Sequence, residues 1–126
     1  KFRSLLNKLL IKLHLMNSVN YDYAQTVAGF FAPEDSWEDV FPTILPQWDR
    51  TARVGKADGV YLNSTPEKFQ QHVEHACEII KDKQPEHKVI ILKSWNEWAE
   101  GNYIEPDVRY GKGYIQALYT ALKRQK

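Results

Sequence analysis

The sequence of 126 residues has little of what would point to a specialised class of protein. Its single cysteine, Cys77, cannot form a disulfide within the chain, and no metal cluster can be built from cysteine. No run of roughly 18 apolar residues occurs, so we expect no transmembrane span. The formal net charge is only +1, which gives no reason to expect nucleic acid or an acidic membrane surface as a partner.

Glycine is scarce, and no glycine-rich loop of the kind that binds phosphate is present. The segment Gly111-Lys112-Gly113 is short and follows no predicted strand, so we expect no nucleotide cofactor, and no other cofactor is indicated. The first residues are basic and then apolar, as in a signal peptide, but Asn7, Lys8 and Lys12 interrupt them. We therefore expect a cytoplasmic protein, with peripheral attachment to the inner membrane as an alternative.

Aromatic residues, by contrast, are abundant at 13% of the chain, with four Trp, seven Tyr and five Phe. Such side chains stabilise cores, but they also form flat apolar platforms with a polar edge, as in sugar-binding proteins. The composition does not choose between these uses. The 43% hydrophobic and 26% charged content is typical of a soluble globular protein, and the length corresponds to one domain.

Hydrophobic periodicity predicts strands that alternate with helices, which is typical of a parallel α/β fold. The strand run 89–92 is continuously apolar, so we expect it to be buried on both faces. We interpret 17–23 as a break, with Asp22 capping the next helix, and we expect Ser64 to form a capping box with Glu67. The expected helices are 2–16, 23–30, 66–80 and 114–122, and the expected strands are 40–46, 59–62 and 89–92.

Two acidic residues follow the predicted strand 89–92, at the end of a strand where functional groups of α/β folds gather. Glu97 and Glu100 are three residues apart and lie beside Trp95 and Trp98. Glycosidic-bond chemistry uses two carboxyl groups that flank one bond, and neighbouring tryptophans can stack on a sugar ring. The structural alternative is that Glu97 pairs with Lys93 or Arg53, Glu100 caps backbone amides, and both tryptophans belong to the core.

A second polar and aromatic cluster, residues 47–53, follows the predicted strand 40–46. Asp49 lies near Arg50 and Arg53, and an arginine can hold a carboxylate or phosphate through two hydrogen bonds, although a loop-stabilising ion pair is the alternative. His72 and His75 have no evident further ligands, so we expect solvated side chains and no metal site. We expect Cys77 to be a small core residue.

Several motifs in these clusters resemble one family of bacterial proteins. The chain from about Tyr21 to Leu122 is similar to the C-terminal half of WbsX-like proteins of lipopolysaccharide and capsule biosynthesis, which are usually called glycosyltransferases and are related to glycoside hydrolase family 99, the endo-α-mannosidase-type enzymes. The motifs that carry this resemblance are Phe41-Pro42 through Trp48-Asp49-Arg50-Thr51-Ala52-Arg53, Asn63-Ser64-Thr65-Pro66-Glu67, the segment from Trp95 to Asp107, and Tyr110-Gly111-Lys112-Gly113-Tyr114.

The resemblance implies a (β/α)8 barrel in which Glu97 and Glu100 are the paired acids. Glu100 would then protonate the leaving oxygen and later activate the acceptor, while Glu97 would assist attack by the sugar's own 2-hydroxyl group. The family name indicates a transferase, whereas the matched acids indicate glycosidic-bond cleavage or transglycosylation. The sugar-binding residues expected from the two clusters are Trp48, Asp49, Arg53, Trp95, Asn96, Trp98 and Asn102.

The length of the chain is the one departure from this family pattern. A complete barrel needs about 250 residues, so 1–126 corresponds to a single partial-barrel domain, with an N-terminal helix in 1–20 and the WbsX-like region in 21–126. The chain is then a fragment, a half-barrel that self-associates or pairs with a missing half, or a remnant without activity. The functional hypotheses are a carbohydrate-active protein of surface polysaccharide biosynthesis, a non-catalytic sugar-binding or scaffold remnant, and a plain structural domain.

Overall fold

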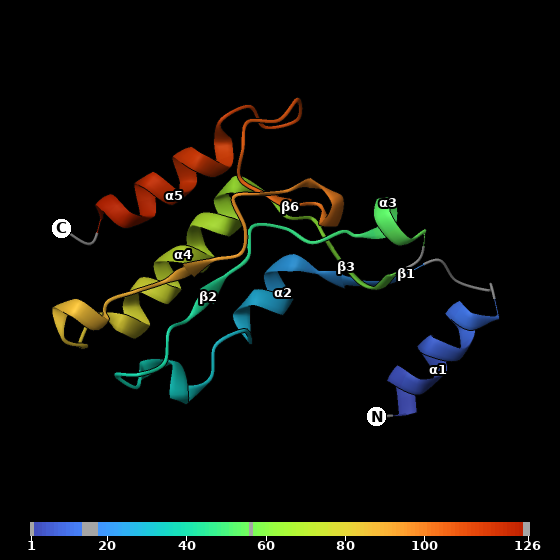
Figure 1. Cartoon of the computed structure of the whole chain (residues 1–126), viewed down its shortest axis with the longest axis horizontal. Coiled ribbons are helices and arrows are strands. Elements are labelled where there is room, and N and C mark those ends of the chain that lie inside the picture. The colour runs from blue at the N-terminus through green and yellow to red at the C-terminus, as the bar shows by residue number, and fades with distance from the viewer. Residues whose placement is uncertain (1, 14–17, 56, 125–126) are drawn as a thin grey trace.

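The computed structural model describes residues 2–13, 18–55 and 57–124, which form a mixed α/β fold (Figure 1). The strands described form three two-stranded sheets, of which two are parallel and one is antiparallel. The half-barrel expected from the family resemblance stays a prediction. The helices are α1 (Phe2–Lys12), α2 (Tyr23–Ala28), α3 (Thr51–Val54), α4 (Pro66–Ile80) and α5 (Gly113–Lys123), and the strands are β1 (Ser18–Asp22), β2 (Thr43–Ile44), β3 (Ala57–Leu62), β4 (Ile91–Leu92), β5 (Asn96–Glu97) and β6 (Asn102–Tyr103).

The main core lies between α4 and α5, which pack side by side at one end of the molecule (Figure 1). Phe69 and Val73 of α4 are fully buried, and the Phe69 ring contacts that of Tyr114 on α5 with 5.7 Å between the ring centres. Cys77 is buried in the same cluster, as predicted. The cluster consists of Ile44, Phe69, Val73, Ala76, Cys77, Ile104, Tyr114, Ala117 and Ala121.

Helix α4 covers the range expected from the sequence, but its cap differs. The side chain of Thr65, not Ser64, accepts a hydrogen bond from the Lys68 amide, and Pro66 occupies the first turn. Ser64 is buried instead, where its hydroxyl donates to the carbonyl of Pro46 and shares a hydrogen bond with the Tyr114 hydroxyl at 2.8 Å. Ser64 therefore ties the start of α4 to α5, a long-range role that a local motif does not reveal.

Strands β2 and β4 pair in parallel, with Ile44 opposite Leu92, and α4 lies between them in the chain. The expectation that 89–92 is a strand buried on both faces is wrong. Only Ile91 and Leu92 are assigned to the strand, and Val89 and Ile91 expose 40% and 46% of their surface. Among the residues described, β4 has one neighbouring strand, β2, so part of its apolar surface remains uncovered.

The segment interpreted as a break contains β1, which pairs in parallel with β3 and places Tyr21 beside Tyr61. Asp22 ends this strand and caps α2, because its carboxylate accepts a hydrogen bond from the Gln25 amide as predicted. Helix α1 lies at the opposite end of the molecule from α5 (Figure 1), and its residues Leu5 and Leu9 are at least half exposed. The last part of the expected helix 2–16 lies outside the described residues.

No helix in the described ranges combines the length and the apolar character needed to cross a bilayer.

Candidate functional site

The chain that follows β4 turns back on itself and presents both candidate acids. Strands β5 and β6 form a short antiparallel hairpin in which Asn96 faces Tyr103 and Glu97 faces Asn102. The residues between the strands form a single 3-10 turn, Trp98–Glu100, and Gly101 closes it in the left-handed conformation with φ +54°. Glu97 therefore ends one strand of the hairpin, and Glu100 ends the turn that follows it.

Hydrogen bonds of the buried residue Asn102 stabilise this hairpin from its interior side. The Asn102 side chain has no exposed surface, and its Oδ1 accepts a hydrogen bond from the Ser94 amide at 2.9 Å. The Ser94 hydroxyl donates to the Asn102 carbonyl at 2.7 Å and accepts from the Glu97 amide at 3.2 Å. A direct chain of hydrogen bonds thus runs from Asn102 through Ser94 to the backbone of Glu97. Asn102 was predicted to bind sugar, and the structure instead places it beneath the turn.

The two clusters identified in the sequence come together at this turn. The Asp49 amide donates to the Glu100 carbonyl at 2.9 Å, and a side chain on Gly101 would come within 2.7 Å of the Asp49 carbonyl oxygen. Glycine at position 101 therefore serves both the left-handed turn and the close approach of the Trp48–Asp49 segment. The Trp48 carbonyl in turn accepts from the Tyr61 amide, which links the site to β3.

Glu100, rather than Glu97, is the acid that faces cations. Its two carboxylate oxygens lie 3.7 Å from the Arg53 guanidinium and 3.5 Å from the Lys93 ammonium. Both cations are about half exposed, so these contacts are weak, in the range of surface ion pairs. Within the residues described, the Glu97 side chain has no hydrogen bond or ion pair, and it is partly buried. The alternative pairing of Glu97 with Lys93 or Arg53 is therefore absent from the described part of the chain.

Asp49 does not pair with either neighbouring arginine in the described structure. Its Oδ1 accepts hydrogen bonds from the amide of Thr51 at 2.9 Å and from the Thr51 hydroxyl at 2.6 Å, which stabilises the start of α3. Arg53, four residues further along, reaches Glu100 instead. The cluster 47–53 consequently contributes one cation to the acid and one backbone amide to the turn.

A hollow of about 400 Å³ opens beside the turn and is walled by aromatic rings. The Trp98 ring stacks on Tyr103 with 3.6 Å between ring centres, and its Nε1 donates to Glu105 at 2.7 Å, so the ring is held in one orientation. Neither Glu97 nor Glu100 is among the residues that line the hollow. Its lining consists of Gln47, Trp48, Asp49, Ala52, Val60, Tyr61, Leu62, Asn63, Ser64, Trp98, Gly101, Tyr103 and Arg109.

The three candidate tryptophans differ in how free their faces are. Trp95 and Trp98 expose 51% and 48% of their surface, whereas the Lys93 ammonium lies over the Trp48 ring, 5.0 Å from its centre. Trp98 combines exposure with a fixed orientation, which makes it the best-formed platform of the three. Asn96 is exposed on the same hairpin.

Sequence reasoning did not identify Tyr61, Asn63, Tyr103 and Arg109 as lining residues of this hollow. Burial and the nearby Asp107 carboxylate raise the pKa of Tyr103, whose hydroxyl donates to Asp107 at 3.3 Å. Tyr61 and Asn63 come from the end of β3, where the strand-end rule that singled out the other clusters would also have found them. Arg109 comes from a loop that no local signal connects to the site.

Of the two histidines of α4, His75 is exposed as expected, whereas His72 is not. His72 is 2% exposed and its ring stacks on Phe31, with 5.0 Å between ring centres. Burial, with a smaller contribution from His75, lowers the pKa of His72 to about 4. Over the described ranges, no group of three or more His, Cys, Asp or Glu side chains could hold a metal ion.

Comparison with known proteins identifies similar sequences but no similar structure. The model of the family described as "Glycosyltransferase WbsX" matches residues 2–118. Two curated relatives, each described as "Uncharacterized protein WxcX", come from Xanthomonas campestris pv. campestris strains B100 and ATCC 33913. Each is 30% identical over 86 residues, which is 68% of this chain and 12% of the relative. No solved structure matches the chain.

Proposed function

We propose that this chain, which belongs to the WbsX glycosyltransferase family, forms part of a carbohydrate-active site that acts on glycosidic bonds in the biosynthesis of bacterial surface polysaccharide, in lipopolysaccharide or capsule. The observation that carries the proposal is the turn after β4, whose two acids are both partly buried. It presents Glu97 and Glu100 next to the immobilised Trp98 ring and the aromatic hollow. Glycosidic-bond chemistry uses two carboxyl groups that flank the bond. A flat aromatic ring beside them can bind the apolar face of a sugar.

In the proposed reaction the two acids divide the work of proton transfer. Glu97 takes the proton of the sugar's 2-hydroxyl group as that oxygen attacks the anomeric carbon, and Glu100 gives a proton to the departing glycosidic oxygen. In the second step Glu100 removes a proton from the acceptor hydroxyl, whose oxygen opens the anhydro ring, and the proton held by Glu97 returns to the 2-oxygen. The acceptor is water in hydrolysis and another sugar in transfer, so the same residues serve both outcomes.

The contacts of the turn suit this division of roles. The hydrogen bonds from Asn102 and Ser94 fix the backbone at Glu97, and the Asp49 amide fixes it at Glu100. The Arg53 guanidinium and the Lys93 ammonium lie 3.7 Å and 3.5 Å from the Glu100 carboxylate, so two cations border the proposed proton donor. We propose that Asn102 positions the turn through its hydrogen bonds with Ser94. The residues that we propose bind or orient the sugar are Trp48, Asp49, Arg53, Trp95, Asn96 and Trp98.

The same proposal includes the barrel architecture that the family resemblance implies. We propose that residues 21–126 are the C-terminal half of a (β/α)8 barrel, preceded by a helix in 1–20. The matched segment spans about an eighth of the WxcX relatives, and β1 and β4 each have one paired edge among the described strands. A further barrel half, from another segment or a second copy, would complete the wall of the site. We place this assembly in the cytoplasm or at the inner face of the cytoplasmic membrane.

The experiment compares Glu97→Gln and Glu100→Gln with the parent protein. Each would be incubated with a panel of nucleotide sugars and bacterial oligosaccharides, and products would be detected by mass spectrometry. We expect a loss of turnover of about 100-fold or more, as for a general acid or base. Glu86→Gln, on the remote turn Pro85–His87, is the matched control. Parent-like turnover in both active-turn variants would refute the catalytic assignment.

A second candidate function is a non-catalytic sugar-binding or scaffold role. It is favoured by one observation: both carboxylates lie outside the lining of the hollow, and Glu100 is engaged by two cations. This alternative predicts that the parent binds oligosaccharides without turning them over. It also predicts that Trp98→Ala weakens binding while Glu97→Gln leaves it unchanged.

A further inference from the structure

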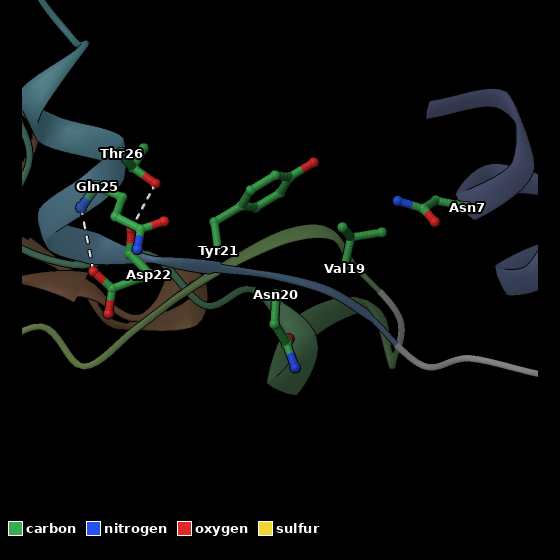
Figure 2. A pocket seen from close by; sticks show the side chains of 7 residues that line it. All are labelled: Asn7, Val19, Asn20, Tyr21, Asp22, Gln25 and Thr26. Atoms are coloured by element: carbon green, nitrogen blue, oxygen red, sulfur yellow. Dashed lines mark hydrogen bonds between the residues drawn. The ribbon is translucent and has the colours of Figure 1, made fainter. Parts of the chain in front are cut away.

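A larger hollow, of about 560 Å³, lies beside β1, away from the turn that carries the acids. Figure 2 shows it bounded by β1 and the start of α2 on one side and by Asn7 of α1 on the other. Tyr21 and Asn20 project from opposite faces of the strand (Figure 2). Tyr21 and Gln25 are exposed, so the hollow offers one aromatic ring and the amide side chains of Gln25 and Asn7 to a ligand.

The lining of this hollow favours an uncharged, hydroxyl-rich ligand. It includes no Lys or Arg, so a phosphate or another anion would find no counter-ion there. Its one carboxylate, Asp22, is already engaged by the Gln25 amide at 3.2 Å and by the Asn63 side chain at 3.0 Å. Amide side chains that donate and accept, together with a tyrosine ring, match the hydroxyl groups and apolar face of a sugar.

Two contacts join this hollow to the one beside the acids. The rings of Tyr21 and Tyr61 meet edge to face with 6.4 Å between their centres, and Asn63 Nδ2 donates to Asp22 Oδ2. Tyr61 and Asn63 both line the hollow beside Trp98. The two hollows therefore adjoin at the carboxyl ends of β1 and β3, the edge at which ligands bind in parallel α/β structures.

We propose that the hollow beside β1 is a second saccharide subsite, so that the ligand of this protein is an uncharged oligosaccharide several sugars long. This inference rests on the proposed function: the reacting bond lies at the Glu97–Glu100 turn, and the chain continues past Tyr61 to end over Tyr21. Binding energy from the remote sugars then helps to hold the reacting bond in place. A nucleotide sugar, with its charged diphosphate, does not fill this second subsite.

The test measures how affinity depends on the length of the saccharide. The probe is a neutral bacterial O-polysaccharide, cut by mild acid and sized into fragments of up to three sugars and of six or more. Isothermal titration would compare the parent with Tyr21→Ala. We expect the parent to bind the long fragments about fivefold to tenfold more tightly, and Tyr21→Ala to lose that gain while binding the short fragments normally.

Two further variants keep the outcome interpretable. Because Tyr21 packs against Tyr61, Gln25→Ala serves as a second variant that removes only an exposed amide, and it should also reduce the length-dependent gain. Tyr119→Ala removes an exposed tyrosine from α5 and should behave as the parent. Short fragments that bind without any gain from length would overturn the subsite but leave the proposed function standing. Absence of binding by every fragment would overturn the subsite, and if the parent also lacks turnover it would overturn the proposed function too.

Discussion

Two regions of this molecule, the α4–α5 core and the β5–β6 hairpin, are held together by different interactions. The α4–α5 end consists of fully buried apolar side chains, such as Phe69 and Val73, that pack across two helices. The hairpin that carries Glu97 and Glu100 has few buried apolar groups and depends on hydrogen bonds from Ser94, Asn102 and Asp49. Loss of volume in a packed core lowers the free energy of unfolding, whereas hydrogen bonds set local geometry, so mutations in the two regions should have different consequences.

The largest effect should come from breaking the packed end. Phe69→Ala removes a fully buried ring that contacts Tyr114, and we expect the free energy of unfolding to fall by about 3–5 kcal/mol. Urea unfolding followed by circular dichroism measures this loss. Phe41→Ala, at an exposed ring, should change stability by no more than about 0.5 kcal/mol. Similar losses for the two variants would show that the α4–α5 cluster is not the stabilising core.

Acid should weaken the same end through His72. Its pKa is about 4 in the folded protein against 6.5 in an unfolded chain, so the unfolded state takes up the proton first as the pH falls. Stability is therefore fully present above pH 6.5 and declines towards pH 4, by up to about 3 kcal/mol. Urea titrations between pH 4 and 7 would measure this, and His72→Phe should remove most of the slope. A parent slope that His72→Phe leaves intact would contradict the assignment.

A smaller and more local effect is expected at the hairpin. Asn102→Ala removes the acceptor of the Ser94 amide and should cost about 1–3 kcal/mol. Its distinctive consequence is faster hydrogen exchange at the amides of residues 94–103, while α4 and α5 keep their protection. Asn96→Ala, at an exposed position of the same hairpin, is the control. Uniform loss of protection in the hairpin and in α4 and α5 would show that the hairpin is not an independent unit.

Local sequence signals predicted the parts of the fold that local interactions determine. Asp22 caps α2 as expected, and α4 occupies the predicted range because apolar residues recur along it at helical spacing. Its cap was misassigned to Ser64, because the buried hydrogen bonds of that hydroxyl go to Pro46 and Tyr114, which are distant in the sequence. Strand β1 was missed for a similar reason, since its pairing with β3 joins segments roughly forty residues apart.

For the site, the strand-end rule correctly brought residues 47–53 and 94–102 together. The strand-end rule did not distinguish the roles of individual residues within these two segments. Asn102 looks like a sugar ligand in the sequence but lies beneath the turn, and Glu100 rather than Glu97 meets Arg53 and Lys93. Which polar side chain points outward depends on the hairpin register, and hairpin register is set by contacts that a one-dimensional pattern does not contain.

The sequence alone determined the longer helices, the family and the residue types available for chemistry, because these depend on spacing and identity along the chain. The tertiary structure decided which side chains share a surface. It buried His72 among aromatic rings, left Ile91 half uncovered, and placed Tyr21 and Tyr61 in contact between two hollows. These outcomes follow from packing and strand pairing between distant segments, whose energies depend on three-dimensional proximity and not on the order of residues.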